Sequence, residues 1–419
     1  MQLKEYKLGD IAEIVNGSTP STSCSHYYDG DIVWITPKDL SEQNTKYIKN
    51  GGRNITKEGF DSCSTHLIPE YNILLTSRAP IGLLAINQVA CCTNQGFKNL
   101  IVNKDIVDVD YLYYYLKYHI AEIETLGTGT TFKEVSKASM EKYTVSLPNI
   151  EEQKKVSSIL SALDAKISLN KQINQNLEAL ARQLYDYWFV QFDFPNEEGK
   201  PYKSSGGKMV YNPILKREIP DRWEVKEIHD ICNVRRGASP RPIDEYMDET
   251  HNGMPWLKIS DATADNSPFV VSIKEYIIEE GIPKSVEITE GTLVVTNSAT
   301  PGMPKFIYKH CCVHDGWLVL TGYKNEEKFY LYYAIEDMRT KLERMASGSI
   351  FKNLRTEYLQ QYKILLPNNQ VLLNFTEVVS VLLDKSLRLA IETNSLTKQR
   401  DELLPLLMNG QVNFDLSDD

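Results

Sequence analysis

The chain has 419 residues, 42% of them hydrophobic and 24% charged, with a formal net charge of −10. The length exceeds that of one ordinary domain, and the composition is typical of a soluble globular protein, which predicts two or three domains. The acidic balance argues against a simple basic nucleic-acid binder, because phosphate neutralisation needs Lys and Arg. It still allows DNA binding by one face, with help from a more basic partner.

Targeting and redox signals are absent from the sequence. No apolar run reaches the ~18 residues of a membrane-spanning helix, and the segment from Met1 to Tyr6 is not a signal peptide. The seven cysteines are an odd number, and none forms a C-x-x-C pair. We therefore expect a reduced, cytoplasmic protein with no membrane contact.

The sequence repeats itself with a period of about 220 residues. One half opens with Tyr6–Ile14 and the other with Trp223–Ile231. The later matches are Gly17–Pro20 with Gly237–Pro240, Trp34 with Trp256, Leu74–Ala79 with Val294–Ala299, Cys91-Cys92 with Cys311-Cys312, Gly96 with Gly316, and Leu147-Pro148 with Leu366-Pro367. We therefore predict a tandem duplication of one globular unit followed by one long helix.

Each unit is predicted to be α+β. Short aromatic and β-branched runs bounded by Gly, Pro and Asn indicate strands, and in the first unit these are residues 31–35, 73–76, 83–90, 99–102 and 143–147. One helix is expected over about 110–124. The predicted boundaries are 1–149 and 221–368 for the two units, 150–192 and 369–410 for the long helices, 193–220 for an extended linker and 411–419 for a tail.

The stretch from Ile150 to Phe189 has neither proline nor glycine, and its apolar residues recur at alternating steps of three and four. This pattern is typical of a coiled-coil seam rather than of the broader stripe of a core helix. The middle of the seam is polar, which costs stability but fixes register. The seam positions are Val156, Leu160, Leu163, Ile167, Asn170, Asn174, Leu177, Ala181, Leu184 and Trp188.

The C-terminal stretch repeats this frame, again with a more polar middle, at Phe375, Val379, Leu382, Ser386, Leu389, Thr393, Leu396, Arg400, Leu403 and Leu407. We predict that the two helices pair as an antiparallel coiled coil. Such pairing would relate the two units by an approximate two-fold axis and present two surfaces at a set separation, as dimeric readers of DNA half-sites do.

No catalytic motif supports an enzyme. The sequence has no P-loop, no adenine-methylation signature and no zinc-site spacing. Asp221, Glu224 and Lys226 superficially match a nuclease set, but the two acids are only three residues apart at the start of one expected strand, whereas metal ligands normally come from separate strands. We therefore expect no catalysis and no metal or cofactor in this chain. An enzyme with unrecognised motifs and a two-headed protein-binding adaptor remain alternatives.

The chain resembles the specificity subunits of type I restriction–modification enzymes over essentially its whole length. The resemblance lies in Tyr6–Ile11, Leu147–Gln153, Phe192–Pro195, Gly206–Val210 and Ile219–Trp223. Two departures are Leu366–Gln370, which lacks the Glu-Gln of the first half, and Arg222, where glycine is more usual. The first departure puts the equivalent contact with a partner subunit in doubt.

The resemblance implies a function that the residues alone do not give. Each unit would be a target recognition domain for one part of a split, asymmetric sequence in double-stranded DNA. The paired helices would set the unread spacer and bind two modification subunits, which methylate adenine with S-adenosylmethionine. Restriction subunits would cut DNA with ATP and Mg²⁺, and a methylation-only complex is the alternative.

Base reading needs polar side chains on loops. The first candidate is the Gly/Thr loop, whose small residues allow close approach to phosphate; it contains Gly127, Thr128, Gly129, Thr130, Thr131 and Lys133. The turn of Thr76, Ser77 and Arg78 comes second, followed by Lys38, Gln95 and Lys98. The counterparts in the second unit are Asn297, Ser298, Ser347, Ser349 and Lys352, together with the basic cluster of Arg235, Arg236 and Arg241.

Overall fold

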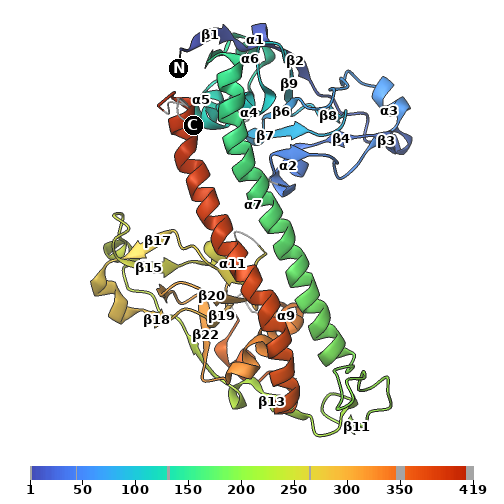
Figure 1. Ribbon diagram of the computed structural model, residues 1–419, viewed down its shortest axis with the longest axis vertical. Coiled ribbons are helices and arrows are strands. Elements are labelled where there is room, and N and C mark those ends of the chain that lie inside the picture. Colours follow the sequence, from blue (N-terminus) through green and yellow to red (C-terminus); the bar gives the residue numbers. More distant parts are fainter. Residues whose placement is uncertain (1, 44, 130–132, 264–265, 346–353, 412–419) are drawn as a thin grey trace, which may run out of the picture. The chain divides into compact units, whose positions relative to one another are not determined.

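The computed structural model describes residues 2–43, 45–129, 133–263, 266–345 and 354–411. The chain divides into two compact units (Figure 1). Unit 1 comprises Met1–Ser168 with Leu396–Asp419, and unit 2 comprises Leu169–Ser395. The long helices α7 (Ile150–Tyr185) and α11 (Asn369–Met408) are therefore shared, because part of each belongs to each unit.

The described residues of unit 1 form a five-stranded sheet with the strand order β2-β9-β6-β7-β5. Its neighbours are antiparallel except for β5, which runs parallel to β7. Two small sheets, β1-β10 and β4-β8, complete the unit. The strands are β1 (Lys4–Lys7), β2 (Ala12–Asn16), β3 (Tyr28–Ile32), β4 (Trp34–Ile35), β5 (Tyr47–Ile48), β6 (Ile73–Ser77), β7 (Ile81–Asn87), β8 (Cys92–Thr93), β9 (Lys98–Val102) and β10 (Thr144–Leu147). The helices are α1 (Leu8–Ile11), α2 (Pro37–Gln43), α3 (Lys57–Asp61), α4 (Val109–Tyr118), α5 (Ile120–Thr125) and α6 (Lys137–Lys142).

Within its described residues unit 2 repeats this topology, with the sheet order β14-β22-β19-β20-β16 and only β16 parallel to its neighbour. The pair β13-β23 corresponds to β1-β10, and β15 lies parallel to β21 as β4 does to β8. The elements are β11 (Met209–Asn212), β12 (Arg217–Pro220), β13 (Glu224–Glu227), β14 (Asn233–Arg236), β15 (Met254–Leu257), β16 (Phe269–Val270), β17 (Glu275–Ile277), β18 (Val286–Ile288), β19 (Thr292–Thr296), β20 (Pro304–Ile307), β21 (Cys311–Val313), β22 (Trp317–Thr321), β23 (Lys363–Leu366), α8 (Ile259–Ala262), α9 (Lys328–Met345) and α10 (Thr356–Gln360). The predicted tandem α+β duplication is confirmed.

Two local predictions are corrected. The single helix expected over 110–124 is two helices, α4 and α5, because His119 (φ −93°, ψ 17°) leaves the helical region between them. The strand expected to reach residue 90 ends at Asn87, whose side-chain amide donates to the Pro69 and Val89 carbonyls and so turns the chain there.

The segment 193–220 is not the extended linker that its proline and glycine content predicted. Strands β11 and β12 form an antiparallel hairpin, and the buried rings of Phe192 and Phe194 pack on Trp223 with centroid separations of 5.6 and 5.1 Å. The aromatic burial offsets the entropy of ordering this segment, and its glycines and prolines form turns within a folded part of unit 2.

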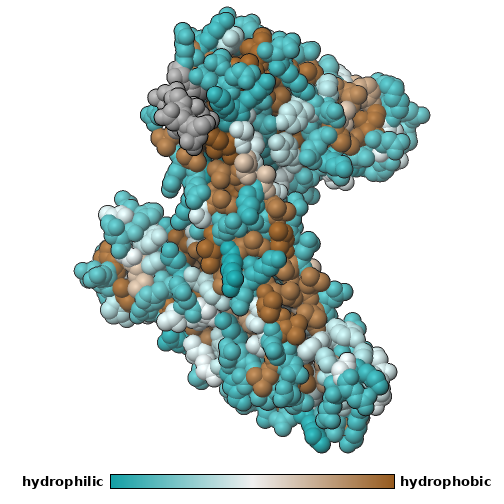
Figure 2. Space-filling view, viewed as in Figure 1, coloured by the Kyte–Doolittle hydropathy of each residue, from teal (hydrophilic) through white to brown (hydrophobic). Residues whose placement is uncertain are grey.

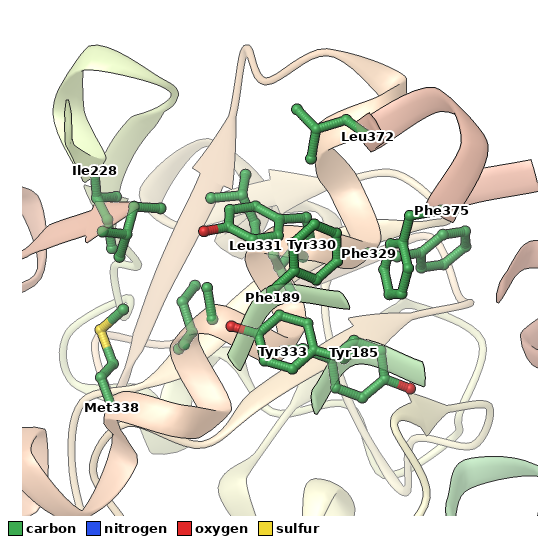
Figure 3. Close-up of a cluster of buried hydrophobic side chains, with 14 of the residues drawn as sticks. Tyr185, Phe189, Ile228, Phe329, Tyr330, Leu331, Tyr333, Met338, Leu372 and Phe375 are labelled. Carbon is green, nitrogen blue, oxygen red and sulfur yellow. The ribbon is translucent and has the colours of Figure 1, made fainter. Parts of the chain in front are cut away.

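The core of unit 2 encloses parts of both long helices (Figure 3). Tyr185 of α7 lies 5.3 Å from Tyr333 of α9 between ring centroids, and Phe189 lies 4.7 Å from Phe375 of α11. The unit 1 core likewise includes Val156 and Leu160 of α7 with Leu407 and Met408 of α11. Aromatic and aliphatic burial therefore joins α7 and α11 to the domain core within each unit.

We predict that Phe375→Ala destabilises unit 2 by about 3–5 kcal/mol, because the truncation leaves a cavity at a fully buried ring. Urea unfolding followed by tryptophan fluorescence would report this directly, since Trp188 and Trp223 lie in the same cluster. The matched control is Val381→Ala on α11, where a side chain 68% exposed should change stability by less than about 0.5 kcal/mol. Equal losses in the two variants would contradict this account of the core.

Candidate nucleic-acid interface

The two long helices pack along the expected seam. In unit 1 the beginning of α7 lies against the end of α11, and in unit 2 the end of α7 lies against the beginning of α11, so the predicted antiparallel pairing is confirmed. The buried seam residues are Val156, Leu160, Ile167, Asn170, Asn174 and Leu177. The half-buried seam residues are Leu163, Leu184, Leu382, Leu389, Leu396 and Leu403. At one point the seam shifts by a residue, since Leu383 is buried more deeply than Leu382.

Polar contacts occur within this apolar seam. In unit 2 the buried Asn170 donates from Nδ2 to Glu392 Oε2 at 2.9 Å. In unit 1 Arg400 donates to Asp164 at 2.8 Å. Such pairs contribute little net stability, but they penalise any other register, in which a polar group would lose its partner. They therefore fix how the helices align within each unit.

A buried ion pair connects the unit 1 sheet to α7. The side chains of Lys46 and Asp110 are 5% and 12% exposed, and Lys46 Nζ lies 2.5 Å from Asp110 Oδ1 and 2.7 Å from Ser161 Oγ of α7. Burial alone would raise the pKa of Asp110, but hydrogen bonds from Lys46 and Tyr71 hold that pKa below its ordinary value. Tyr114 extends the network by donating to Asp164 at 2.6 Å.

The Gly/Thr loop of unit 1 is closed by paired backbone hydrogen bonds of 3.0 Å between Thr128 and Glu134. The next residue, Val135, donates its N–H to the Ser77 carbonyl at 3.0 Å, which ties the loop to the end of β6. Gly129 has φ +126°, a conformation that favours glycine, and the exposed Lys133 side chain is available to solvent. Thr130 and Thr131 lie outside the described residues.

The structure brings this loop and the turn after β6 together through one carboxylate. Glu134 lies 3.6 Å from Arg78 and 3.0 Å from Lys98. Arg78 remains partly exposed, whereas the Lys98 side chain is buried. We therefore retain Arg78 as a candidate DNA contact and assign Lys98 a structural role, because its buried ammonium is occupied by Glu134.

The predictions of Thr76 and Ser77 as DNA contacts are corrected in the same way. Both side chains are buried. Thr76 Oγ1 accepts the N–H of Leu83 at 2.8 Å, and Ser77 Oγ donates to the Gly96 carbonyl at 3.2 Å. The Thr76 hydroxyl satisfies the backbone of β7 and the Ser77 hydroxyl that of the turn between β8 and β9, so neither faces solvent to reach a base edge.

Two weaker candidates of unit 1 are at the surface. Lys38 is highly exposed on α2, where it faces Glu42 at 3.5 Å. Gln95 is exposed in the turn before β9, and its side-chain oxygen accepts the hydroxyl of Thr19. Only Gln95 is held by a partner distant in sequence, so it is the better positioned of the two.

The basic cluster of unit 2 is organised by Asp315, which the sequence did not single out. Arg236 donates from Nε to the Asp315 carbonyl oxygen at 2.7 Å, and Arg241 lies 3.4 Å from its carboxylate. Burial would raise the pKa of Asp315, but the Ser239 hydroxyl and the two guanidinium groups keep that pKa below its usual value. Arg235 points elsewhere and donates to the Glu287 carbonyl at 3.4 Å.

The remaining candidates of unit 2 divide between buried and surface positions. Asn297 is buried and donates from Nδ2 to the Asp315 carbonyl at 2.9 Å, so its prediction as a DNA contact is corrected to a role in holding this turn. Ser298 beside it is half-buried. Ser347, Ser349 and Lys352 lie outside the described residues.

Sequence reasoning missed Glu134 and Asp315, because an isolated acid carries no DNA-binding signal. The signal that could have identified Asp315 is the repeat itself, since Gln95 and Asp315 each stand one residue before the matched glycines Gly96 and Gly316. Among the described residues, no group of three or more His, Cys, Asp or Glu side chains is placed to hold a metal ion. In the same part of the chain no helix has the length and apolarity to cross a bilayer.

A family model described as the type I restriction modification DNA specificity domain matches residues 2–179 and 220–373. The type I restriction enzyme MjaIX specificity subunit of Methanocaldococcus jannaschii is 32% identical over 415 residues, covering 97% of this chain and 92% of the relative. The HindI specificity subunit of Haemophilus influenzae is 26% identical over 342 residues, covering 67% and 72%. A crystal structure of a type I restriction-modification S subunit from M. genitalium shares the fold, with a TM-score of 0.61 and 16% identity over 97% of this chain and 96% of that one.

We predict that Lys46→Met destabilises unit 1 by about 3–5 kcal/mol at neutral pH, because it leaves the Asp110 carboxylate buried without its partner. In the unaltered protein the depressed pKa of Asp110 stabilises the fold above its unfolded pKa, and this contribution is lost as pH falls through the folded pKa. In Lys46→Met burial without the ammonium raises the pKa of Asp110, so its carboxyl is relieved by protonation as pH falls through that raised pKa. The stability difference between the two proteins should therefore begin to narrow above the ordinary Asp pKa of about 4 and continue to narrow below it.

Urea unfolding of both proteins across pH measures this difference. The matched control is Lys46→Met combined with Asp110→Asn, which removes the buried charge and should recover most of the lost stability. A difference that is independent of pH, or a double variant no better than the single one, would show that the ion pair is not the cause.

Proposed function

This chain belongs to the family of type I restriction modification DNA specificity domains, and it is a specificity subunit of a type I restriction–modification system, the component that recognises DNA. We propose that its two units read the two parts of one split, asymmetric DNA sequence. The observation that carries this proposal is a shared framework with different surface chemistry. Both units have the same sheet order, yet unit 2 has a cluster of arginines where unit 1 has neutral side chains.

The framework repeats down to single hydrogen bonds. Val135 donates to the Ser77 carbonyl in unit 1, and Leu354 donates to the Asn297 carbonyl in unit 2 at 2.6 Å. In both units this bond ties a residue of the later chain, Val135 or Leu354, to the end of a central strand. One framework contact made by two different sequences suits a protein that reads two different half-sites with one scaffold.

Catalysis in this proposal belongs to other subunits. Two modification subunits would methylate adenine with S-adenosylmethionine, and restriction subunits, where the system includes them, would use ATP and Mg²⁺. The net charge of −10 supports this division, because a more basic partner would add to the phosphate contacts that an acidic chain can make. All seven cysteines are described and free, which is compatible with work on host DNA in a reducing cytoplasm.

An apolar groove of 990 Å³ in unit 2 supports the docking of a modification subunit on the helices. The groove is formed by the end of α7 and the beginning of α11, and exposed apolar side chains follow both helices there (Figure 2). Patches of this kind mark protein interfaces more often than free surface. Its apolar lining residues include Leu180, Leu184, Val378, Val381 and Leu382.

We predict that replacing residues 221–368 by the corresponding unit of another specificity subunit changes one half of the methylated sequence and leaves the other half and the spacer unchanged. The measurement is a map of methylated adenines on plasmid DNA incubated with the complete complex and S-adenosylmethionine. The control is the purified chain without partner subunits, which should leave the DNA unmodified. A change in both halves would refute independent reading, and methylation by the chain alone would refute the division of labour.

We predict that four residues inserted after Asn170, matched by four after Thr393, lengthen the unread spacer by about one or two base pairs. The insertion adds ~6 Å of helix, against ~3.4 Å per base pair of DNA. Methylation mapping should show the same bases in both half-sites at a new separation, or no methylation where the changed heptad register disrupts the seam. The control, four residues inserted after the exposed Ser205, should leave the spacer unchanged. Altered letters with an unchanged spacer would contradict this role of the helices.

A further inference from the structure

One short turn occupies the same place in both units. It joins β8 to β9 in unit 1 and β21 to β22 in unit 2. Asn94 Oδ1 accepts the Gly96 N–H at 2.8 Å, and His314 Nδ1 accepts the Gly316 N–H at 2.8 Å. The first side chain of the turn therefore closes it in both units, although its chemistry differs.

The turn is also fixed to the central strand in both units. The Gly96 carbonyl accepts a hydrogen bond from the Ser77 N–H at 2.7 Å, and the Gly316 carbonyl accepts one from the Asn297 N–H at 2.9 Å. A third bond holds the middle residue, since the Thr19 hydroxyl donates to Gln95 in unit 1. In unit 2 the Ser239 hydroxyl donates to Asp315 at 2.7 Å. The backbone hydrogen bonds and the anchoring hydroxyl are thus common to both turns. Only the side chain at the middle position differs, and it is Gln95 in unit 1 and Asp315 in unit 2.

The residues around the middle position of the turn are neutral in unit 1 and charged in unit 2. Arg236 and Arg241 flank Asp315, and the repeat places Asn16 and Ser21 at the equivalent positions of unit 1. Arg241 is 74% exposed even though its guanidinium lies 3.4 Å from the Asp315 carboxylate. Among the described residues of this cluster, two guanidinium groups face one carboxylate, which leaves positive charge directed at solvent.

A cavity of 380 Å³ opens beside Arg241 in unit 2. The buried Trp256 and the half-buried His314 form its wall, and Lys258 and Ser260 line it together with Arg241 and Asp315. Burial holds the pKa of His314 below its ordinary value, which favours the neutral form of this ring. Arg241 and Lys258 bring donors to the opening, although Lys258 is also paired with Glu275 at 2.5 Å, and the Asp315 carboxylate is engaged by Ser239 and the arginines.

We propose that this turn is a base-reading position of each unit: Arg241, oriented by Asp315, contacts guanine in one half-site, and Gln95, oriented by Thr19, contacts adenine in the other. Arg pairs in bidentate fashion with guanine O6 and N7, and Gln with adenine N6 and N7. A carboxylate that holds the guanidinium in place lowers the entropic cost of making two bonds at once. Asp315 is a positioning residue here, since it acts on DNA only through Arg241.

This inference rests on the proposed function, because it assigns residues to half-sites that the function requires. The experiment uses the complete complex and a plasmid library in which each base pair of the wild-type methylated sequence is varied in turn. Methylation of every library member is compared for the unaltered chain and for Arg241→Gln, Asp315→Asn and Gln95→Arg. Arg222→Gln is the matched control, because that arginine of unit 2 is exposed and distant from the turn in sequence.

We expect Arg241→Gln to lower discrimination at one guanine of one half-site on the order of ten- to a hundredfold, with the other half-site and the spacer unchanged. Asp315→Asn should weaken preference for the same base without replacing it. Gln95→Arg should shift preference from adenine to guanine in the other half-site, and Arg222→Gln should change nothing.

A uniform decrease in methylation across all library members after Arg241→Gln would overturn the assignment, because it is the signature of a phosphate contact. If Arg241→Gln and Gln95→Arg leave the preferred bases unchanged at full methylation, the assignment is overturned as well. If the unaltered complex methylates DNA without requiring a split sequence, the proposed function itself is overturned, so the two failures are distinguishable. Assembly of each variant with its partner subunits, measured by gel filtration, separates misfolding from altered reading.

Discussion

Burial of the seam of α7 and α11 inside the domain cores is the constraint on which the structure depends. In unit 2 the rings of Tyr185, Phe189 and Phe375 pack with α9 (Figure 3), and in unit 1 Val156 and Leu407 fill the corresponding place. A helix with one narrow apolar seam gains most of its stability from tertiary packing. The two helices and the two sheets therefore complete each other, and neither is a separate module attached to the other.

Polar groups decide which of several apolar alignments is adopted. A seam of Leu, Ile and Val can slide by a heptad at small cost, because each side chain meets another of similar shape. Asn170 with Glu392 and Arg400 with Asp164 remove that freedom, since a shifted register would bury a charge or an amide without its partner. In unit 1 the network of Lys46 and Asp110 extends the same principle from the seam to the sheet.

The sequence predicted what depends on periodicity and repetition. The seam frame and the duplication follow from patterns that extend over many residues, so a local exception does not hide them. The hairpin in 193–220 was missed because proline and glycine mark turns equally well in a linker and in a packed segment, and the difference lies in Phe192 and Phe194 finding Trp223. The error at Thr76 has a similar cause. A polar residue after an apolar strand looks the same in sequence whether it faces solvent or accepts a buried backbone N–H, as Thr76 does from Leu83.

The same limit explains why the acidic residues of the candidate interface were overlooked, and it bears on how an acidic chain reads DNA. Glu134 engages Arg78 and Lys98, and Asp315 engages Arg236 and Arg241. Each carboxylate cancels part of the field of the two cations that it holds, so the long-range attraction of these cations for DNA is reduced. Each held cation keeps its donors in a defined direction, however, which is what discrimination between base edges requires. A chain built in this way gains specificity at the expense of affinity, and it fits a complex in which the phosphate contacts that supply affinity come from another subunit.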